Sequence, residues 1–448
     1  MFGNTLMLVE FSVENFKSIK DEQVLSMVKA TGNKMLDNYF DSQALSVPEL
    51  LKTAVIYGAN ASGKSNILKA MFQMKNILKN SFNKELDENI PVTPFFFNAV
   101  SMSEPTTFNI SFVMDLPDEE GLKRTLVQYG FSADRKQVYE EWLSVYPKGR
   151  EQGWFHRLYD SESKEYTWNE SSFFKGQKNT WKNNTRSDQL FLSTAVHLNS
   201  KQLKPIYDVL MDNIIIISED RIGDKLTKEF CKNDERDKKL ILSLMQSSDI
   251  DVDDIIFEKT KISSIKFPKD MPLEIQKELS KRIHEEHVDE VFFIHTDEEG
   301  NEVKIILRDE SDGTQKMFEF SSLIFSSLRN GGLLIIDEFN KSLHPDLVRF
   351  LVKLFNSEQN SANGQLIFTT HETSVLRRDL LRRDQIWFCE KGKEKSTNLF
   401  SLSKFTSRDD GREDIEEYYL HGRYGAKPII SDLIFHDSKQ KILEEVNK

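Results

Sequence analysis

The chain has 448 residues, more than a single hydrophobic core usually holds, so we expect more than one structural unit. No segment approaches the roughly 18 consecutive apolar residues of a membrane-spanning helix, and the N-terminus lacks the pattern of a secretion signal, so we expect a cytoplasmic protein with no membrane contact. The formal net charge of −12 disfavours a protein that binds DNA over its whole surface, because such binding depends on cationic groups.

Residues 1–200 are rich in predicted strands. Apolar and polar side chains alternate in residues 107–114, 126–131 and 138–145, which is typical of half-buried strands. Residues 117–121 contain proline and glycine and are expected to form a turn. We therefore expect an antiparallel lobe in this first unit.

A phosphate-binding motif lies within the same unit. The apolar run 53–57 is followed by glycine, lysine and serine in the spacing Gly-x-x-x-x-Gly-Lys-Ser, and then by apolar residues at helical spacing. Glycines allow a tight turn that points N–H groups at phosphate oxygens, and the helix adds the positive end of its dipole. The predicted phosphate loop comprises Gly58, Ala59, Asn60, Ala61, Ser62, Gly63, Lys64, Ser65 and Asn66. Lys64 is expected to reach the outer phosphates and Ser65 to ligate Mg²⁺.

Residues 201–290 have a different character. They are highly charged, with helical periodicity in 225–246 and 273–286, and prolines interrupt the pattern near 268 and 272. We expect a mostly helical insertion. It is too short and too poorly patterned in heptads for a long coiled coil, so it should be compact. Residues 291–448 return to strand, helix, strand order and are expected to form the last unit.

A second catalytic motif lies in this last unit. Residues 333–336 are four aliphatic side chains, typical of a buried strand, and Asp337 and Glu338 follow directly. A carboxylate at the end of such a strand suits Mg²⁺ coordination, which we assign to Asp337. The next carboxylate can polarise an attacking water, so Glu338 is the expected general base.

The long separation between the two motifs points to a particular superfamily. Lys64 and Asp337 are 273 residues apart, too far for one compact strand–helix–strand unit. The chain thus resembles the split nucleotide-binding domain of the ATP-binding cassette superfamily. Ser311 and Gly313 agree with its Ser-Gly-Gly-Gln signature, whereas Asp312 replaces a glycine and Gln315 comes one position late. The alternative for this segment is an ordinary helix cap.

Two later positions follow the order of that superfamily. Ser342 to Pro345 resemble the D-loop, although His344 stands where transporter-type cassettes usually have aspartate. His371 follows the predicted strand 365–370, in the place of the switch histidine that contacts the terminal phosphate. The resemblance implies a catalytic role for His371 beside Lys64 and Glu338.

Within the superfamily, the chain resembles soluble ATPases related to RecF, SMC and OLD proteins, and most of all the bacterial AAA-type ATP-binding proteins of the RloA and AbiL kind. The residues that carry this resemblance include 9–19, Leu190 to Ser193, Thr370 to Thr373 and the tail 422–428. It implies an α/β fold with a mixed sheet, an antiparallel lobe and an insertion. It also implies hydrolysis of ATP with Mg²⁺, in a homodimer or higher homo-oligomer in which Ser311 and Gly313 of one subunit complete the site of another.

Two biological roles remain open. The first is a nucleotide-driven switch in phage defence (abortive infection) that acts through a separate effector protein, a nuclease or a toxin. The second is a RecF-like repair ATPase that binds DNA. The arginines 377, 378, 382 and 383 would offer a local basic face if they lie on a helix, although we favour an ordinary solvated helix face as their explanation. A transporter ATPase is disfavoured by the long separation of the motifs.

Cysteine and histidine usage argues against a zinc site or a disulfide framework. Cys231 and Cys389 lie far apart and outside any paired spacing, so we expect two structural thiols. His284 and His287 are expected to be surface residues of a charged helix.

Overall fold

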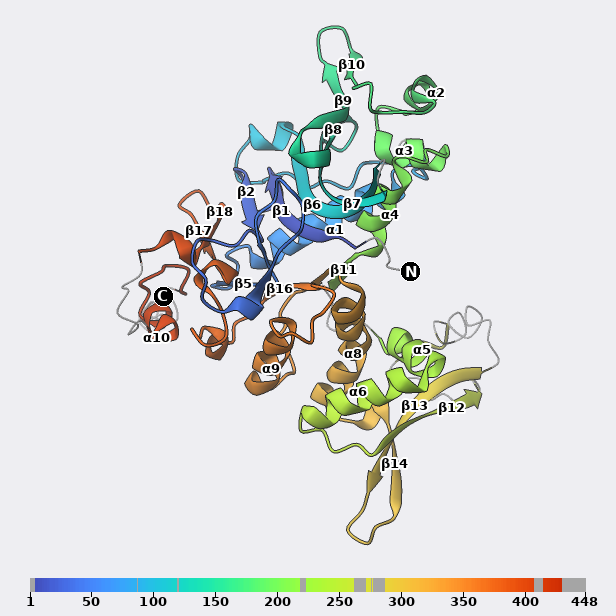
Figure 1. Cartoon of the computed structure of the whole chain (residues 1–448), viewed down its shortest axis with the longest axis vertical. Coiled ribbons are helices and arrows are strands. Elements are labelled where there is room, and N and C mark those ends of the chain that lie inside the picture. Colours follow the sequence, from blue (N-terminus) through green and yellow to red (C-terminus); the bar gives the residue numbers. More distant parts are fainter. Residues whose placement is uncertain are drawn as a thin grey trace, which may run out of the picture.

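The computed structural model describes residues 5–86, 88–118, 121–217, 223–261, 271–274, 276, 287–406 and 414–428. It is an α/β protein built around two large sheets, with a smaller three-stranded sheet at the opposite end of the molecule from the antiparallel lobe (Figure 1). None of the helices in these residues is long and apolar enough to cross a membrane.

The antiparallel lobe is a seven-stranded sheet in the order β10-β9-β8-β7-β6-β1-β2. Its strands are β1 (Met7–Glu14), β2 (Gln23–Ser26), β6 (Thr106–Asp118), β7 (Gly121–Ala133), β8 (Val138–Tyr146), β9 (Gln152–Asp160) and β10 (Glu165–Asn169). Every pairing in it is antiparallel. This confirms the strands expected from the alternating runs 107–114, 126–131 and 138–145. A small sheet of β3 (Tyr39–Phe40) and β4 (Leu50–Leu51) precedes the phosphate loop.

The second large sheet has six strands in the order β11-β15-β16-β5-β17-β18. They are β5 (Thr53–Gly58), β11 (Ile214–Ile217), β15 (Leu333–Ile336), β16 (Gln365–Thr369), β17 (Ile386–Lys391) and β18 (Thr397–Ser401). The first five are parallel and β18 is antiparallel to β17. In parallel sheets of this kind, functional groups gather where the strands end at their carboxyl side.

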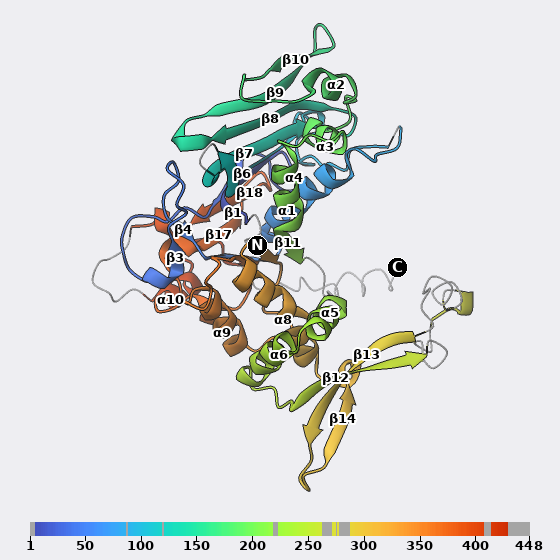
Figure 2. The ribbon, with the colours of Figure 1, turned by 45° about the vertical axis from the view of Figure 1, so that its right-hand side comes forward.

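Both faces of the six-stranded sheet are buried, which explains its continuous apolar strands. Ala54, Ile56 and Ile335 belong to the larger core, which also includes α1 (Lys64–Asn80), α3 (Phe191–His197), α4 (Lys204–Asp212) and the antiparallel sheet. Val55 and Ile336 belong to a second core, which includes α8 (Asp312–Asn330), α9 (Pro345–Phe355) and α10 (Ile415–Leu420). Figure 2 shows α8 and α9 on the side of this sheet away from the antiparallel lobe.

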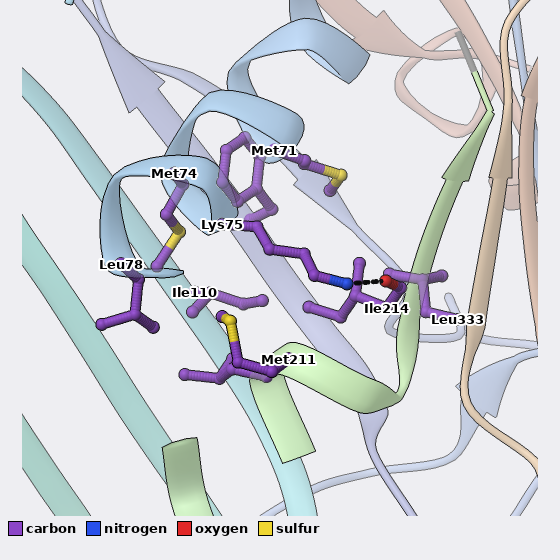
Figure 3. A pocket seen from close by; sticks show the side chains of 10 residues that line it. Met71, Met74, Lys75, Leu78, Ile110, Met211, Ile214 and Leu333 are labelled. Carbon is purple, nitrogen blue, oxygen red and sulfur yellow. Dashed lines mark hydrogen bonds between the residues drawn. The ribbon is translucent and has the colours of Figure 1, made fainter. Parts of the chain in front are cut away.

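A partly buried lysine ties the helix of the phosphate loop to the edge of the six-stranded sheet. Lys75 of α1 donates to the carbonyl oxygen of Ile214, the first residue of β11, at 2.5 Å (Figure 3). The apolar side chains around it, including Met71, Met74 and Met211, line a small cavity of about 20 Å³. Burial lowers the pKa of Lys75, and Asp212 opposes that effect. The contact fixes β11 against α1, so Ile214–Ile217, beyond the expected boundary at 200, belong to the same body as the six-stranded sheet.

An ion pair inside the antiparallel lobe anchors α3. Arg157 Nε lies 3.1 Å from Glu141 Oε2, and both side chains are at most 1% exposed. Glu141 also accepts the N–H groups of Phe191 and Leu192 at 2.6 and 3.0 Å, which cap the start of α3. Burial raises the pKa of the Glu141 carboxyl, while Arg157 and these N–H groups act in the opposite direction. The segment Leu190 to Ser193 thus has a structural role as the buried start of this helix.

The insertion combines two helices with a sheet. Helices α5 (Lys225–Asn233) and α6 (Glu235–Ser247) match the helical pattern of 225–246. They pack with an antiparallel sheet of β12 (Asp254–Lys261), β13 (His287–Thr296) and β14 (Glu302–Ile306), which the mostly helical prediction did not include. The predicted helix 273–286 and His284 lie almost wholly outside the described residues, as does the side chain of His287.

Helix α8 belongs to two cores at once. Met317, Phe320 and Ile324 pack in the core beneath the six-stranded sheet. Phe318, on another face of the helix, packs in the core of the insertion with Ile241, Val291 and other apolar residues, and its ring meets that of Phe293 at 5.5 Å. Arg329 near the end of α8 also pairs with Asp237 of α6 at 2.5 Å. The insertion therefore rests directly on the helix that follows the signature segment.

The last described residues pack into the second core. Tyr419 of α10 and Tyr424 both stack on Phe388 of β17, with ring centroids 5.4 and 5.6 Å apart. Tyr424 is only 2% exposed, so this aromatic residue of the tail 422–428 is part of the core. Thr373, just after His371, donates to Glu416 of α10 at 2.6 Å. The tail thus contacts the segment that carries the predicted switch histidine.

Candidate active site

The predicted phosphate loop lies between the end of β5 and the start of α1. Gly63 is the residue before α1 and has φ 105°, a left-handed conformation that favours glycine. A Cβ at this position would come within 1.9 Å of Thr397 Oγ1, so position 63 has no room for a side chain. At Gly58, a Cβ would come within 2.2 Å of the carbonyl oxygen of Cys389. The two glycines of the motif are therefore required by packing as well as by the turn.

Hydrogen bonds from β17, β18 and an N-terminal turn hold the loop. The carbonyl oxygen of Ser62 accepts from Thr397 Oγ1 at 2.9 Å and from Cys389 Sγ at 3.3 Å. Asn66 Nδ2 donates to Ser18 Oγ at 2.7 Å, and Ser18 Oγ lies 2.7 Å from Thr397 Oγ1. The loop backbone is thus held in place by side chains from far along the chain. Its helix start leaves N–H groups without intrahelical acceptors, which suits an anion.

Lys64 lies folded against its own loop. Its Nζ donates to the carbonyl oxygens of Gly58 and Ala59 at 2.8 and 3.1 Å, and the residue is 7% exposed. Burial lowers the pKa of Lys64, whereas the nearby Asp337 and Glu338 favour its charged form. The ammonium group therefore sits within electrostatic reach of both acidic residues.

The two motifs meet through a short hydrogen-bond network. Ser65 Oγ donates to Asp337 Oδ1 at 3.0 Å, and Thr369 Oγ1 donates to the same oxygen at 2.6 Å. The Glu338 N–H in turn donates to Thr369 Oγ1 at 2.7 Å. Strand β16, which ends at Thr369, lies between β15 and β5, and the Thr369 hydroxyl contacts both acidic residues that follow β15. Glu338 has φ 52°, and its side chain is exposed at this edge of the sheet.

Thr369 is a site residue that sequence reasoning missed. The available signal was the pair of threonines directly before His371, at the end of a predicted buried strand. A threonine in a strand is ordinary by propensity, so only the sheet order reveals that its hydroxyl contacts Asp337.

His371 lies beside the same network. Its backbone N–H donates to Asn340 Oδ1 at 3.2 Å, and Thr370 Oγ1 donates to the same oxygen at 2.9 Å. The pKa of His371 is lowered by partial burial and then by the positive charge of Lys64, with Glu338 and Asp337 opposing. The imidazole therefore lies near Lys64, Asp337 and Glu338. Asn340, two residues after Glu338, holds the backbone of His371 through this hydrogen bond.

The oxygen donors at the network suit a hard cation. Ser65 and Asp337 offer a hydroxyl and a carboxylate within 3.0 Å of each other, which is the ligand chemistry of Mg²⁺ bound with phosphates. In the part of the chain that the structure describes, no group of three or more His, Cys, Asp or Glu residues could hold a metal. Cys231 and Cys389 are both buried free thiols.

Ser311 and Gly313 lie apart from this network. Ser311 caps α8: its Oγ accepts the Thr314 N–H at 3.1 Å, as the helix-cap interpretation requires. A side chain at Gly313 would meet the carbonyl oxygen of Ser342 at 3.0 Å. Both residues line an open cavity of about 850 Å³ with Ser342, His344 and the loop after α6. No described residue of the phosphate loop lines this cavity, so the structure does not bring the two parts together within one chain.

Glu310, directly before Ser311, contacts the insertion. Its carboxylate lies 2.8 Å from His295 Nε2 on β13, and both side chains are mostly buried. Gln315 Nε2 donates to the Glu310 carbonyl oxygen at 2.7 Å. The signature segment is thus held from both sides, by α8 and by the sheet of the insertion.

The four arginines after His371 do not share a helix face, so that prediction was wrong. The segment forms short 3-10 turns, Thr373–Val375 and Arg383–Gln385. Arg382 is 8% exposed and pairs with Asp384 at 2.9 Å, and Arg377 pairs with Asp379 at the same distance. Arg383 donates to two carbonyl oxygens, those of Leu402 and Phe405. At least three of the four charges thus have partners within the fold.

Comparison with known proteins identifies the family. A family model described as "AAA domain, putative AbiEii toxin, Type IV TA system" matches residues 54–377. No curated protein matches the chain. Among solved structures, the SMC head domain from Thermotoga maritima is similar at 12% identity and a TM-score of 0.37, covering 88% of this chain and 98% of that one. An Smc head domain with an extended coiled coil, bound to the C-terminal domain of ScpA derived from Pyrococcus furiosus, is similar at 12% identity and a TM-score of 0.38, covering 99% and 100%. The family model spans residues 54–377, most of the length of this chain, including the phosphate loop and the acidic pair, so the chain belongs to this family of AAA-domain proteins.

Proposed function

We propose that this protein binds ATP with Mg²⁺ at the phosphate loop and hydrolyses it to ADP and phosphate. The observation that carries the proposal is the contact between Ser65 and Asp337, which joins the phosphate loop to the acidic pair. Lys64 and His371 lie within electrostatic reach of the same carboxylates. A nucleotide phosphate, a metal-holding carboxylate and a base are the parts that phosphoryl transfer to water requires.

Each residue has a distinct task in this proposal. The loop N–H groups and Lys64 bind the phosphates, and Lys64 would exchange the carbonyl oxygens of Gly58 and Ala59 for phosphate oxygens. Glu338 accepts the proton of the attacking water. The Thr369 hydroxyl accepts the Glu338 N–H and so orients the backbone of Glu338. His371, held by Asn340, contacts the terminal phosphate. Ser65 and Asp337 would hold Mg²⁺, which supplies positive charge against the developing negative charge of the phosphates.

The proposed site is completed by a second subunit. Ser311 and Gly313 line a cavity that includes no described residue of the phosphate loop, so in this arrangement they cannot contact a nucleotide bound to the loop of their own chain. Their N–H groups at the start of α8 suit an anion presented by another copy of the chain. ATP bound between two copies would favour the closed homodimer, and hydrolysis would remove that bridge.

For the biological role we propose a nucleotide-driven switch in phage defence, of the RloA and AbiL kind, acting through a separate nuclease or toxin. The description of the family, which names a toxin and a toxin–antitoxin system, supports a role in defence. The net charge of −12 and the internal use of Arg382 and Arg383 disfavour the alternative, a RecF-like ATPase that clamps DNA.

The proposed activity is tested by measuring ATP turnover and nucleotide affinity for the wild type and for Asp337→Asn. The variant keeps the size of the side chain but removes the charge that would hold Mg²⁺, so turnover should fall by at least about 100-fold. Asp41→Asn, at an exposed aspartate after β3 whose Oδ1 accepts the Gln43 N–H, keeps that acceptor and should leave turnover within about twofold. No ATP turnover by the wild type would refute hydrolysis.

The biological role needs a separate test. DNA-stimulated, salt-sensitive turnover would favour repair, and co-purification with a nuclease or toxin encoded by an adjacent gene would favour defence.

A further inference from the structure

Helix α10, near the end of the described chain, packs against the strand that leads into the phosphate loop. Its Tyr419 lies against two paired residues of the six-stranded sheet, Tyr57 of β5 and Phe388 of β17, with ring centroids 5.8 and 5.4 Å apart. Tyr57 directly precedes Gly58, the first residue of the phosphate loop. Tyr57, Phe388 and Tyr419 all belong to the core beneath this sheet. The tail therefore has a fixed position next to the proposed site.

The residues directly after α10 fold back onto it. The Arg423 N–H donates to the carbonyl oxygen of Tyr418 at 2.9 Å, and the Arg423 guanidinium lies 4.4 Å from the centre of the Tyr418 ring. The Tyr419 hydroxyl donates to the carbonyl oxygen of Ala426 at 3.4 Å. These contacts of the tail motif hold the helix that carries Glu416.

The backbone that carries His371 is supported on both sides. On one side, the His371 N–H donates to Asn340 Oδ1 at 3.2 Å. On the other side, the Tyr57 hydroxyl donates to the carbonyl oxygen of Glu372 at 2.7 Å. Burial raises the pKa of Tyr57 well above its ordinary value, so the hydroxyl keeps the proton that it donates. His371 thus lies between a residue of the segment after β15 and a residue of the strand before the phosphate loop.

Glu416 of α10 contacts the next residue along. Its Oε1 accepts the Thr373 hydroxyl at 2.6 Å, and Thr373 is the second residue after His371. Thr373 begins the 3-10 turn Thr373–Val375, and the Glu372 side chain caps the start of that turn. Residues 372 and 373 are therefore both fixed, one by β5 and the other by the tail.

A hydrogen bond between a tail and a loop often stabilises the fold and does nothing else. Here the loop is unusual, because residues 370–376 belong to no sheet and to no helix longer than three residues. Their backbone lacks the regular hydrogen bonds of such an element and relies more on side-chain contacts. The loss of one of these contacts is therefore expected to move the histidine.

We propose that Glu416 and Tyr57 are positioning residues for His371, and that the tail is thereby a working part of the ATPase site. Glu416 holds Thr373, Tyr57 holds the preceding carbonyl group, and together they set how the imidazole faces the terminal phosphate. This inference rests on the proposed function, in which His371 contacts that phosphate.

The first test compares steady-state ATP turnover of Glu416→Ala with that of the wild type. The variant removes the acceptor of the Thr373 hydroxyl, so kcat should fall about three- to tenfold, the scale of one hydrogen bond, while KM stays within about twofold. Glu416→Gln keeps an oxygen acceptor and should restore the rate. Tyr57→Phe removes only a hydroxyl and should resemble Glu416→Ala. Glu417→Ala is the matched control, because Glu417 is exposed and lies in the same first turn of α10.

The second test asks whether the loss passes through His371. Glu416→Ala is combined with His371→Gln, in which no imidazole remains to be positioned, so the double variant should turn over ATP at the rate of His371→Gln alone. A contact that only stabilises the tail would lower the rate by the same factor in both backgrounds. That result would overturn the proposal, as would a wild-type rate in Glu416→Ala.

A third measurement does not need turnover and so separates this inference from the proposed function. In protein with ¹³C-labelled histidine, the Cε1–Hε1 NMR signal of His371 is assigned by its absence from His371→Gln. The signal should move in Glu416→Ala and keep its wild-type position in Glu416→Gln and in Glu417→Ala. An unmoved signal in Glu416→Ala would overturn the positioning role even if the wild type hydrolyses ATP. A moved signal in a protein without turnover would refute only the ATPase activity.

Discussion

Ser65 Oγ donates to Asp337 Oδ1 at 3.0 Å, although 272 positions separate the two residues in the chain. Ser65 follows β5 and Asp337 follows β15, and β16, a strand from the last part of the chain, lies between these two strands. Thr369, at the end of β16, donates a hydrogen bond to the same carboxylate. The predictions below test what this arrangement does.

Glu338→Gln should retain ATP binding while slowing turnover by about 10²–10⁴-fold, because the amide cannot accept the proton of the attacking water. Single-turnover hydrolysis and nucleotide binding measured on the same preparation separate the two effects. Glu358→Gln, an exposed glutamate of the same lobe, serves as the control. Unchanged turnover in Glu338→Gln would exclude Glu338 as the base.

Thr369→Ala should lower turnover by about tenfold, since it removes both the hydroxyl that donates to Asp337 and the acceptor for the Glu338 N–H. Thr369→Ser keeps the hydroxyl and should restore most of the rate. Steady-state ATP turnover of the two variants is compared after their thermal midpoints are shown to agree. Equal rates in the alanine and serine variants would mean that the hydroxyl does not position the acidic pair.

The pH profile of turnover should report His371. Burial and the charge of Lys64 lower its pKa below the ordinary value of 6.5, so the imidazole is neutral at pH 7 and gains a proton only in more acidic solution. Turnover should therefore stay level down to about pH 6.5 and fall below it. In His371→Gln the rate should be low and this acidic limb absent. An acidic limb of the same midpoint in the variant would assign it to another group.

Mixing two inactive variants tests the shared site. Lys64→Ala and Ser311→Ala should each lose most ATP turnover alone. In a mixed dimer one site combines Lys64 of one subunit with Ser311 of the other, so activity should return to roughly a quarter of the wild-type rate when equal amounts are mixed and exchanged. Absence of any recovery, with mixed dimers verified by mass spectrometry, would place Ser311 outside a shared site.

Replacement of one partner of the buried ion pair should destabilise the antiparallel lobe. Arg157→Met leaves the Glu141 carboxylate buried without its cation and should lower the free energy of unfolding by about 3–5 kcal/mol. The double variant Arg157→Met, Glu141→Gln should lose less than the sum of the single changes, because no uncompensated charge remains. Urea unfolding at pH 7 measures the free energy of unfolding of Arg157→Met, Glu141→Gln and the double variant. If the losses of the two single variants add up to that of the double variant, the two residues act independently.

The strand, loop and helix around the Gly-x-x-x-x-Gly-Lys-Ser motif were predictable from the sequence, because glycine, lysine and serine at fixed spacing reflect strict local geometry. Gly63 illustrates this, since both its φ and its contact with Thr397 forbid a side chain. The antiparallel strands were also predictable, because alternation reports directly on a half-buried face.

Features that depend on distant contacts were not predictable. The role of Thr369 depends on the order of strands in the sheet, which no local pattern encodes. The arginines 377, 378, 382 and 383 have helical spacing, but the segment forms 3-10 turns and Arg382 is buried against Asp384. Tyr424 lies between Arg423 and Gly425 in a polar segment, and its stack on Phe388 shows that it is part of the core.

Helix α8 has one face in the core beneath the six-stranded sheet and another in the core of the insertion, and the His295–Glu310 contact joins the insertion to the residue just before Ser311. A rotation of the insertion would therefore move the start of α8. A protein bound to the three-stranded sheet would then shift the segment that we propose meets a second copy, and formation of that proposed dimer would shift the sheet in return.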